Sequence, residues 1–110
     1  MWSASRGNVA LLPLDTNNNY QKWVITNSGK SLQNVGNALV VEFVGNGRFV
    51  VLKSPNSSST KQQFTFSTGS DTSIQSVDTP FRYLVPLQYE ADKLVIDDSD
   101  STNKWKIDVV

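Results

Sequence analysis

Aromatic side chains beside short polar residues are the most suggestive chemical grouping in this chain of 110 residues. Trp2 stands among Ser and Ala residues, and Tyr20 follows three consecutive asparagines that include Asn17 and Asn19. An exposed aromatic ring can stack on the apolar face of a sugar. An Asn carboxamide both donates and accepts hydrogen bonds, which suits sugar hydroxyls. Trp2, Asn17, Asn19 and Tyr20 are therefore candidate ligand-binding residues.

A further candidate pair is Tyr89 and Asp92, which we expect near the tip of a hairpin. Each candidate also has a structural alternative. Trp2 could pack into the interior of the fold, and a run of asparagines also suits a turn. The residue types alone therefore leave ligand binding and structural support both open.

Catalytic chemistry has little support in the sequence. The absence of His and Cys excludes Ser–His and Cys–His nucleophiles and most zinc sites. The carboxylates show no pairing of the kind that glycoside hydrolysis needs. The charge-dense stretch at 97–100 lacks the central Gly and closing Glu of a calcium loop. We predict a protein that is not an enzyme and that needs no metal or cofactor.

Composition narrows the class of partner and compartment. Ten Lys and Arg residues balance ten Asp and Glu residues, so no net field favours nucleic acid or an anionic membrane. The longest apolar run, Ala38–Val41, is far too short to span a membrane. Because the first residues show no signal pattern and Cys is absent, we expect a cytoplasmic protein, with secretion as an alternative.

An internal repeat organises the chain. The aromatic residues Trp23, Phe64 and Trp105 recur at two equal intervals, and Leu32 and Ile74 are separated by nearly the same interval in similar surroundings. A period of about 41 residues is typical of repeat architectures. We expect the three aromatic residues to lie in the core, and the glutamines just before them to bond to turn backbone rather than to a ligand.

Strands joined by polar turns account for most of the chain. Val is frequent, and no stretch shows a clean helical apolar period. The Asn46–Gly47 dipeptide between two apolar runs predicts a β-hairpin. Turns are also expected at Ser5–Asn8 and at Glu90–Asp92. Strands are predicted near 9–14, 20–26, 31–35, 38–44, 48–53, 62–67, 72–77, 81–87, 93–97 and 103–109.

Three units of about 41 residues would close into a six-stranded barrel capped by three hairpins, which leaves few exposed sheet edges. The sequence thus predicts one all-β domain over residues 1–110. Its first repeat is incomplete at the N-terminus, where Met1–Ser5 is only a remnant of the hairpin. About 15–20 residues are missing from that unit by comparison with the repeat length. A homodimer or an exchange of strands would cover such a gap.

Short polar motifs accompany the recurring aromatic residues, and a polar turn follows the first of them. They are Gln21-Lys22-Trp23, Gln63 near Phe64, Asn103-Lys104-Trp105 and the turn Asn27-Ser28-Gly29-Lys30. These features resemble the β-trefoil of the ricin-B-like lectin superfamily, whose repeats carry a Q-x-W motif. The resemblance covers the whole chain apart from the absent start. The small size and the lack of Cys are similar to small mushroom β-trefoil lectins and inhibitors.

The resemblance implies a non-enzymatic lectin that binds glycans or glycoproteins. One departure is that the second strands, at 39–41 and 83–85, lack the Asp that competent sites of the family carry. The alternative that the resemblance implies is a protease inhibitor acting through an exposed loop. The candidate loops are Ser5-Arg6-Gly7, Lys53-Ser54-Pro55-Asn56 and Pro80-Phe81-Arg82.

Overall fold

The structure is a computed structural model, and it describes residues 2–5, 7–13, 15–45, 50–67, 71–78, 82–86, 95–98 and 105–106. Over these residues the chain is all-β, with two short 3-10 helices. Among these residues, no helix has the length and hydrophobicity of a membrane span. The predicted all-β class is confirmed at this level.

The strands are short, and they appear in the following order. They are β1 (Trp2–Ser5), β2 (Asn8–Leu11), β3 (Trp23–Thr26), β4 (Ser31–Asn34), β5 (Val40–Glu42), β6 (Val51–Lys53), β7 (Phe64–Phe66), β8 (Asp71–Thr72), β9 (Ile74–Ser76), β10 (Tyr83–Pro86), β11 (Val95–Asp98) and β12 (Trp105–Lys106). The 3-10 helices are η1 (Asn19–Gln21) and η2 (Thr60–Gln62).

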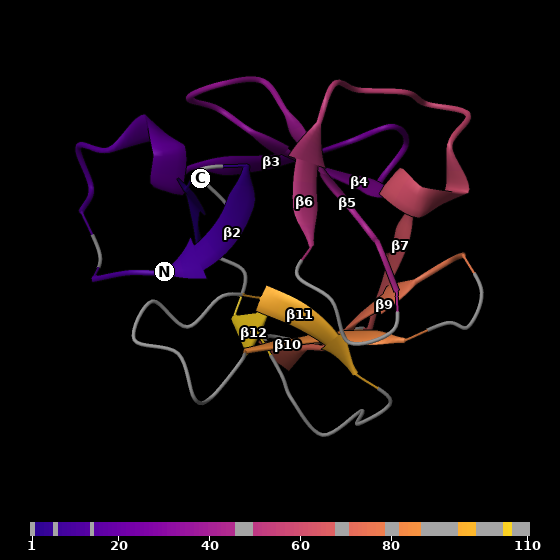
Figure 1. Ribbon diagram of the computed structural model, residues 1–110. Coiled ribbons are helices and arrows are strands. Elements are labelled where there is room, and N and C mark those ends of the chain that lie inside the picture. The colour runs from indigo at the N-terminus through magenta and orange to yellow at the C-terminus, as the bar shows by residue number, and fades with distance from the viewer. Residues whose placement is uncertain are drawn as a thin grey trace.

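A six-stranded sheet with the order β1-β2-β6-β5-β4-β3 forms the larger part of the fold. A four-stranded sheet, β11-β10-β9-β7, lies against it, and β12 pairs with β8 (Figure 1). The larger sheet is curled, because residues of its two outermost strands touch. The indole N–H of Trp23 in β3 donates to the carbonyl of Trp2 in β1 at 3.0 Å. Their rings meet edge to face, with centroids 6.1 Å apart.

All three predicted hairpins are visible as strand pairs. The antiparallel strands β1 and β2 are joined through Gly7, whose φ of +79° suits glycine, so the predicted turn at Ser5–Asn8 is confirmed. The strands β5 and β6 pair through Val41 and Leu52, as the sequence predicts. The turn residues Asn46 and Gly47 between them lie outside the described residues. The strands β10 and β11, on either side of the third predicted turn, pair through Val85 and Ile96. That turn, Glu90–Asp92, also lies outside the described residues.

Two of the predicted strands begin with a short 3-10 helix instead. The prediction of strand from residue 20, and again from residue 62, is wrong because η1 and η2 occupy the first positions. In η1 the side chain of Asn18 accepts a hydrogen bond from the Tyr20 N–H at 2.9 Å. Such a cap offers the backbone an alternative to the sheet ladder. The strands β3 and β7 therefore start at Trp23 and Phe64.

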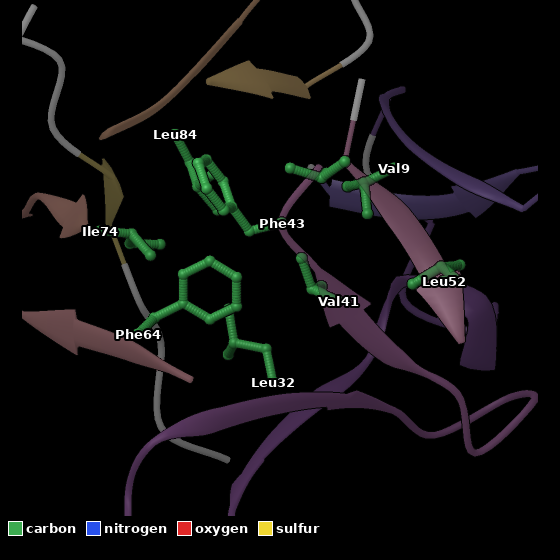
Figure 2. Close-up of a cluster of buried hydrophobic side chains, with 9 residues drawn as sticks. Val9, Leu32, Val41, Phe43, Leu52, Phe64, Ile74 and Leu84 are labelled. Atoms are coloured by element: carbon green, nitrogen blue, oxygen red, sulfur yellow. The ribbon is translucent and has the colours of Figure 1, made fainter. Parts of the chain in front are cut away.

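The core lies between the two larger sheets. Figure 2 shows Phe43 with Ile74, Leu84 and Phe64 on one side of it and strands β2, β5 and β6 on the other. Phe64 is only 1% exposed, which confirms its predicted core position. Trp23 is half-buried and packs against this cluster. The side chain of Trp105, the third predicted core aromatic, lies outside the described residues. The buried members of the cluster are Val9, Leu32, Val41, Phe43, Val50, Leu52, Phe64, Ile74 and Leu84.

Candidate functional site

A buried glutamine, Gln21, fixes the loop that leads into η1. Its side-chain N–H donates to the carbonyl of Pro13 at 2.9 Å, and its side-chain oxygen accepts from the Asp15 N–H at 2.7 Å. Both ends of the carboxamide are thus used by the protein, as buried polar groups require. The prediction that this glutamine supports turn backbone is confirmed.

Gln62 makes the same pair of bonds one repeat later. It donates to the Ser54 carbonyl at 3.0 Å and accepts from the Asn56 N–H at 2.7 Å. The resemblance was based on Gln63 in this unit, but the structure gives the equivalent role to Gln62. Gln63 is half-buried and donates instead to the carbonyl of Ser57 at 3.2 Å. Gln62 and Phe64 have the same Q-x-aromatic spacing as Gln21 and Trp23. This spacing therefore identifies Gln62 as the equivalent of Gln21.

A second buried amide, Asn34, joins η1 to the turn after β4. Asn34 is 1% exposed, and its side-chain N–H donates to the Tyr20 carbonyl at 2.9 Å. Its side-chain oxygen accepts from the N–H groups of Gly36 at 2.9 Å and Asn37 at 3.3 Å. The backbone of Tyr20 is therefore held on one side by Asn34 and on the other by Asn18.

Tyr20 lies against Gly36 with nearly half of its surface exposed, at 48%. A Cβ atom added at Gly36 would come within 2.8 Å of Tyr20 Cδ1 and 3.0 Å of Tyr20 Cγ. Real Cβ atoms essentially never come so close to another atom. The ring can rest there only because residue 36 has no side chain. We call this arrangement the Tyr20–Gly36 platform.

Asn17 and Asn19 flank the platform in the same loop, and both are exposed. The backbone around them is ordered by the side chain of Asp15, which accepts from the Asn17 N–H at 3.1 Å. Within the described part of the chain, neither the Asn17 nor the Asn19 side chain has a hydrogen-bond partner. Both carboxamides are therefore available to an external group.

Of the other predicted site residues, Trp2 lies in β1, a strand that neighbours η1. Trp2 is half-buried, packs against the core cluster and touches Trp23, so it is not the freely exposed platform that the sequence suggested. Tyr89 and Asp92 lie outside the described residues. The structure thus brings together three of the predicted residues, Asn17, Asn19 and Tyr20. It adds Gly36 and Asn34, which the sequence reasoning did not single out.

The corresponding place in the following unit has no aromatic ring. Lys61 stands one repeat length after Tyr20. Asp78 is the equivalent of Gly36, because its N–H donates to Ser76 Oγ at 3.1 Å, as the Gly36 N–H donates to Asn34. There the Thr60 hydroxyl donates to the Asp78 carboxylate at 3.0 Å. An internal hydrogen bond therefore occupies the place of the platform. Among the described residues, only the first of these two equivalent loops presents an aromatic ring.

No group of three or more His, Cys, Asp or Glu side chains suited to a metal ion occurs in the described part of the chain. What the Tyr20 loop offers is an exposed ring, carboxamides and a phenol hydroxyl on a fixed backbone. These groups suit recognition by stacking and hydrogen bonding.

Comparisons with models of known protein families, with curated proteins and with solved structures found no match.

Proposed function

We propose that the chain is a β-trefoil of the ricin-B-like type with an incomplete first repeat. The support is local and comes from two units. Gln21 and Gln62 make matching bonds, η1 and η2 occupy matching positions, and the N–H groups of Val35 and Val77 donate to the carbonyls of Lys22 and Gln63. Equivalent contacts separated by one repeat length are what the repetition of one structural unit predicts.

Within that fold, we propose a non-enzymatic function, the binding of glycans. The observation that carries this proposal is the Tyr20–Gly36 platform. An exposed ring on a fixed backbone loses little conformational freedom when a ligand binds. The ring stacks on the apolar face of a sugar, while Asn17 and Asn19 form hydrogen bonds with its hydroxyls.

A glycan array is the experiment that tests this function. The wild-type protein is expected to bind a defined subset of glycans, and Tyr20→Ala to lose most of that signal. Lys61→Ala is the matched control, because it alters the equivalent loop and leaves the platform intact. A wild-type protein that binds no glycan on the array would contradict the proposal. Equal loss of signal in both variants would contradict the site.

A second candidate function is protease inhibition, which one observation favours. The loop at Ser54–Asn56 is exposed, and Gln62 holds its backbone at Ser54 and at Asn56. Inhibitory loops need such rigidity, because flexible loops lose more entropy when they bind. The Asn56 carboxamide oxygen, however, accepts from the N–H and hydroxyl of Ser58 at 3.2 and 2.8 Å. Its side chain is therefore engaged within the loop.

The remaining predicted inhibitory loops centre on residues outside the described part, Arg6 and Phe81. Assays with trypsin, papain and a legumain-like protease decide between the two functions. Inhibition that Pro55→Gly weakens and Tyr20→Ala leaves unchanged would favour the inhibitor. Absence of inhibition together with glycan binding is the outcome we expect.

A further inference from the structure

The strand β3 forms one end of the six-stranded sheet, and its backbone pairs with a neighbouring strand, β4, on one side only. The N–H of Val35 donates to the carbonyl of Lys22 at 2.8 Å. Bonded and non-bonded pairs alternate along an antiparallel ladder. The peptide groups of Val24 therefore face β4, and those of Trp23 and Ile25 face away from it.

The orientation of β4 supports this assignment. Trp23 lies opposite Asn34, whose N–H donates at 2.8 Å to Leu39, on the side away from β3. The outward N–H and C=O groups of Trp23 and Ile25 have no hydrogen-bond partner in the described part of the chain. They form a row of donors and acceptors that another strand can pair with.

The side chains on this edge are apolar and accessible. Val24 is 46% exposed and Ile25 is 47% exposed. Proteins usually protect exposed edges with charged residues, proline or a bulge. Between Trp23 and Thr26 the sequence has neither charge nor proline, and the register with β4 is continuous. The edge thus lacks these devices against pairing.

We propose that β3 pairs antiparallel with β3 of a second copy of this chain. In the register that satisfies the outward groups, Trp23 lies opposite Ile25 of the partner subunit, and Val24 meets Val24 of the partner subunit at the two-fold axis. The two chains then exchange the N–H···O bonds of Trp23 and Ile25. A contact that uses the same patch on both copies is isologous and closes as a dimer.

The free edge of β3 is complementary to itself in three respects. A second copy of this chain is therefore the partner that we assign to this edge. The outward peptide groups fall opposite one another, and apolar side chains meet apolar side chains. The cation of Lys22 falls opposite Thr26 of the partner subunit, so no like charges lie directly opposite. This dimer does not depend on glycan binding. If both proposals hold, it joins two Tyr20 platforms and raises avidity.

Light scattering of the full chain over a wide range of concentration tests the dimer. We expect the wild type to reach twice the mass of one chain, and Ile25→Lys to stay monomeric with an unchanged circular dichroism spectrum. The matched control is Val44→Lys, which puts the same charge on a residue that is 42% exposed outside β3. That variant should dimerise like the wild type.

Amide hydrogen exchange on the wild type tests the register without any substitution. The Ile25 amide should exchange many-fold more slowly at high protein concentration, whereas the Val24 amide should be protected by β4 at every concentration. A wild type that stays monomeric overturns the proposal. So does a dimer in which exchange at Trp23 and Ile25 does not depend on concentration, because the interface would then lie elsewhere.

Discussion

Replacement of Gly36 by alanine tests the packing of the platform directly. The φ of Gly36 does not lie in the left-handed region, so alanine fits the backbone and the added methyl group is the main perturbation. That Cβ would lie 2.8 Å from Tyr20 Cδ1 and 3.0 Å from the Tyr20 nitrogen. Because ordinary carbon contacts lie at about 3.5–4.0 Å, the ring must retreat by about 0.7–1.2 Å.

The backbone of Tyr20 has little freedom to retreat. Its N–H donates to Asn18 and its carbonyl accepts from Asn34, both at 2.9 Å. Overpacking of this kind costs about 1–3 kcal/mol. The lower entropy of the unfolded alanine chain offsets about 0.4–1 kcal/mol of that loss. We expect a net loss of about 1–2 kcal/mol in the free energy of unfolding, measured by urea titration.

A double-mutant cycle with Tyr20→Ala isolates the contribution of the ring. Without the ring, Gly36→Ala should cost less by about 0.5 kcal/mol or more, because only the clash with the Tyr20 nitrogen remains. Equal costs in the two backgrounds would refute the reasoning that the ring rests on Gly36. Gly29→Ala is a useful control, since Gly29 has a φ of +85° and no atom within 4 Å of the added Cβ. Its cost should not change with Tyr20→Ala.

Two further predictions concern the scaffold of the fold. Phe64→Ala removes a ring that is 1% exposed and should lower the free energy of unfolding by about 3–5 kcal/mol in urea titrations; a loss below about 1 kcal/mol would contradict its core position. Gln62→Leu leaves the Ser54 carbonyl and the Asn56 N–H without their partner. It should cost about 1–3 kcal/mol and speed amide exchange at Asn56. Gln63→Leu, which removes a single bond to Ser57, should do neither, and equal effects of the two would contradict the assignment.

The strand pattern was predictable where apolar runs are separated by turn residues. The pairing of Val41 with Leu52 and the turn through Gly7 follow from apolar runs and glycine. The starts of β3 and β7 were missed because a short 3-10 helix precedes each strand. At η1 the side-chain cap of Asn18 competes locally with the ladder. Strand propensity does not reflect competition between a side-chain cap and the sheet ladder.

Part of the candidate site was predictable because its residues are contiguous. Asn17, Asn19 and Tyr20 share one polar loop, so composition alone grouped them. Gly36 and Asn34 reach Tyr20 only through the fold, and no local pattern places them beside it. One signal was available. The turn after β4 has glycine where the equivalent turn of the next unit has Asp78, which frees the space that the Tyr20 ring occupies.

The most direct test of the account is an NMR titration of the wild-type protein with the best glycan from the array. We predict that the Tyr20 ring signals and the side-chain amide signals of Asn17 and Asn19 shift together. The backbone amide signals of Thr60 and Lys61, in the equivalent loop of the next unit, should stay in place. Burial of about 40–60 Å² of the ring by a sugar should contribute about 1–1.5 kcal/mol. Tyr20→Ala should therefore weaken binding by about five- to twelve-fold. Shifts confined to another surface, or binding unchanged in Tyr20→Ala, would contradict the claim that the Tyr20–Gly36 platform binds glycan.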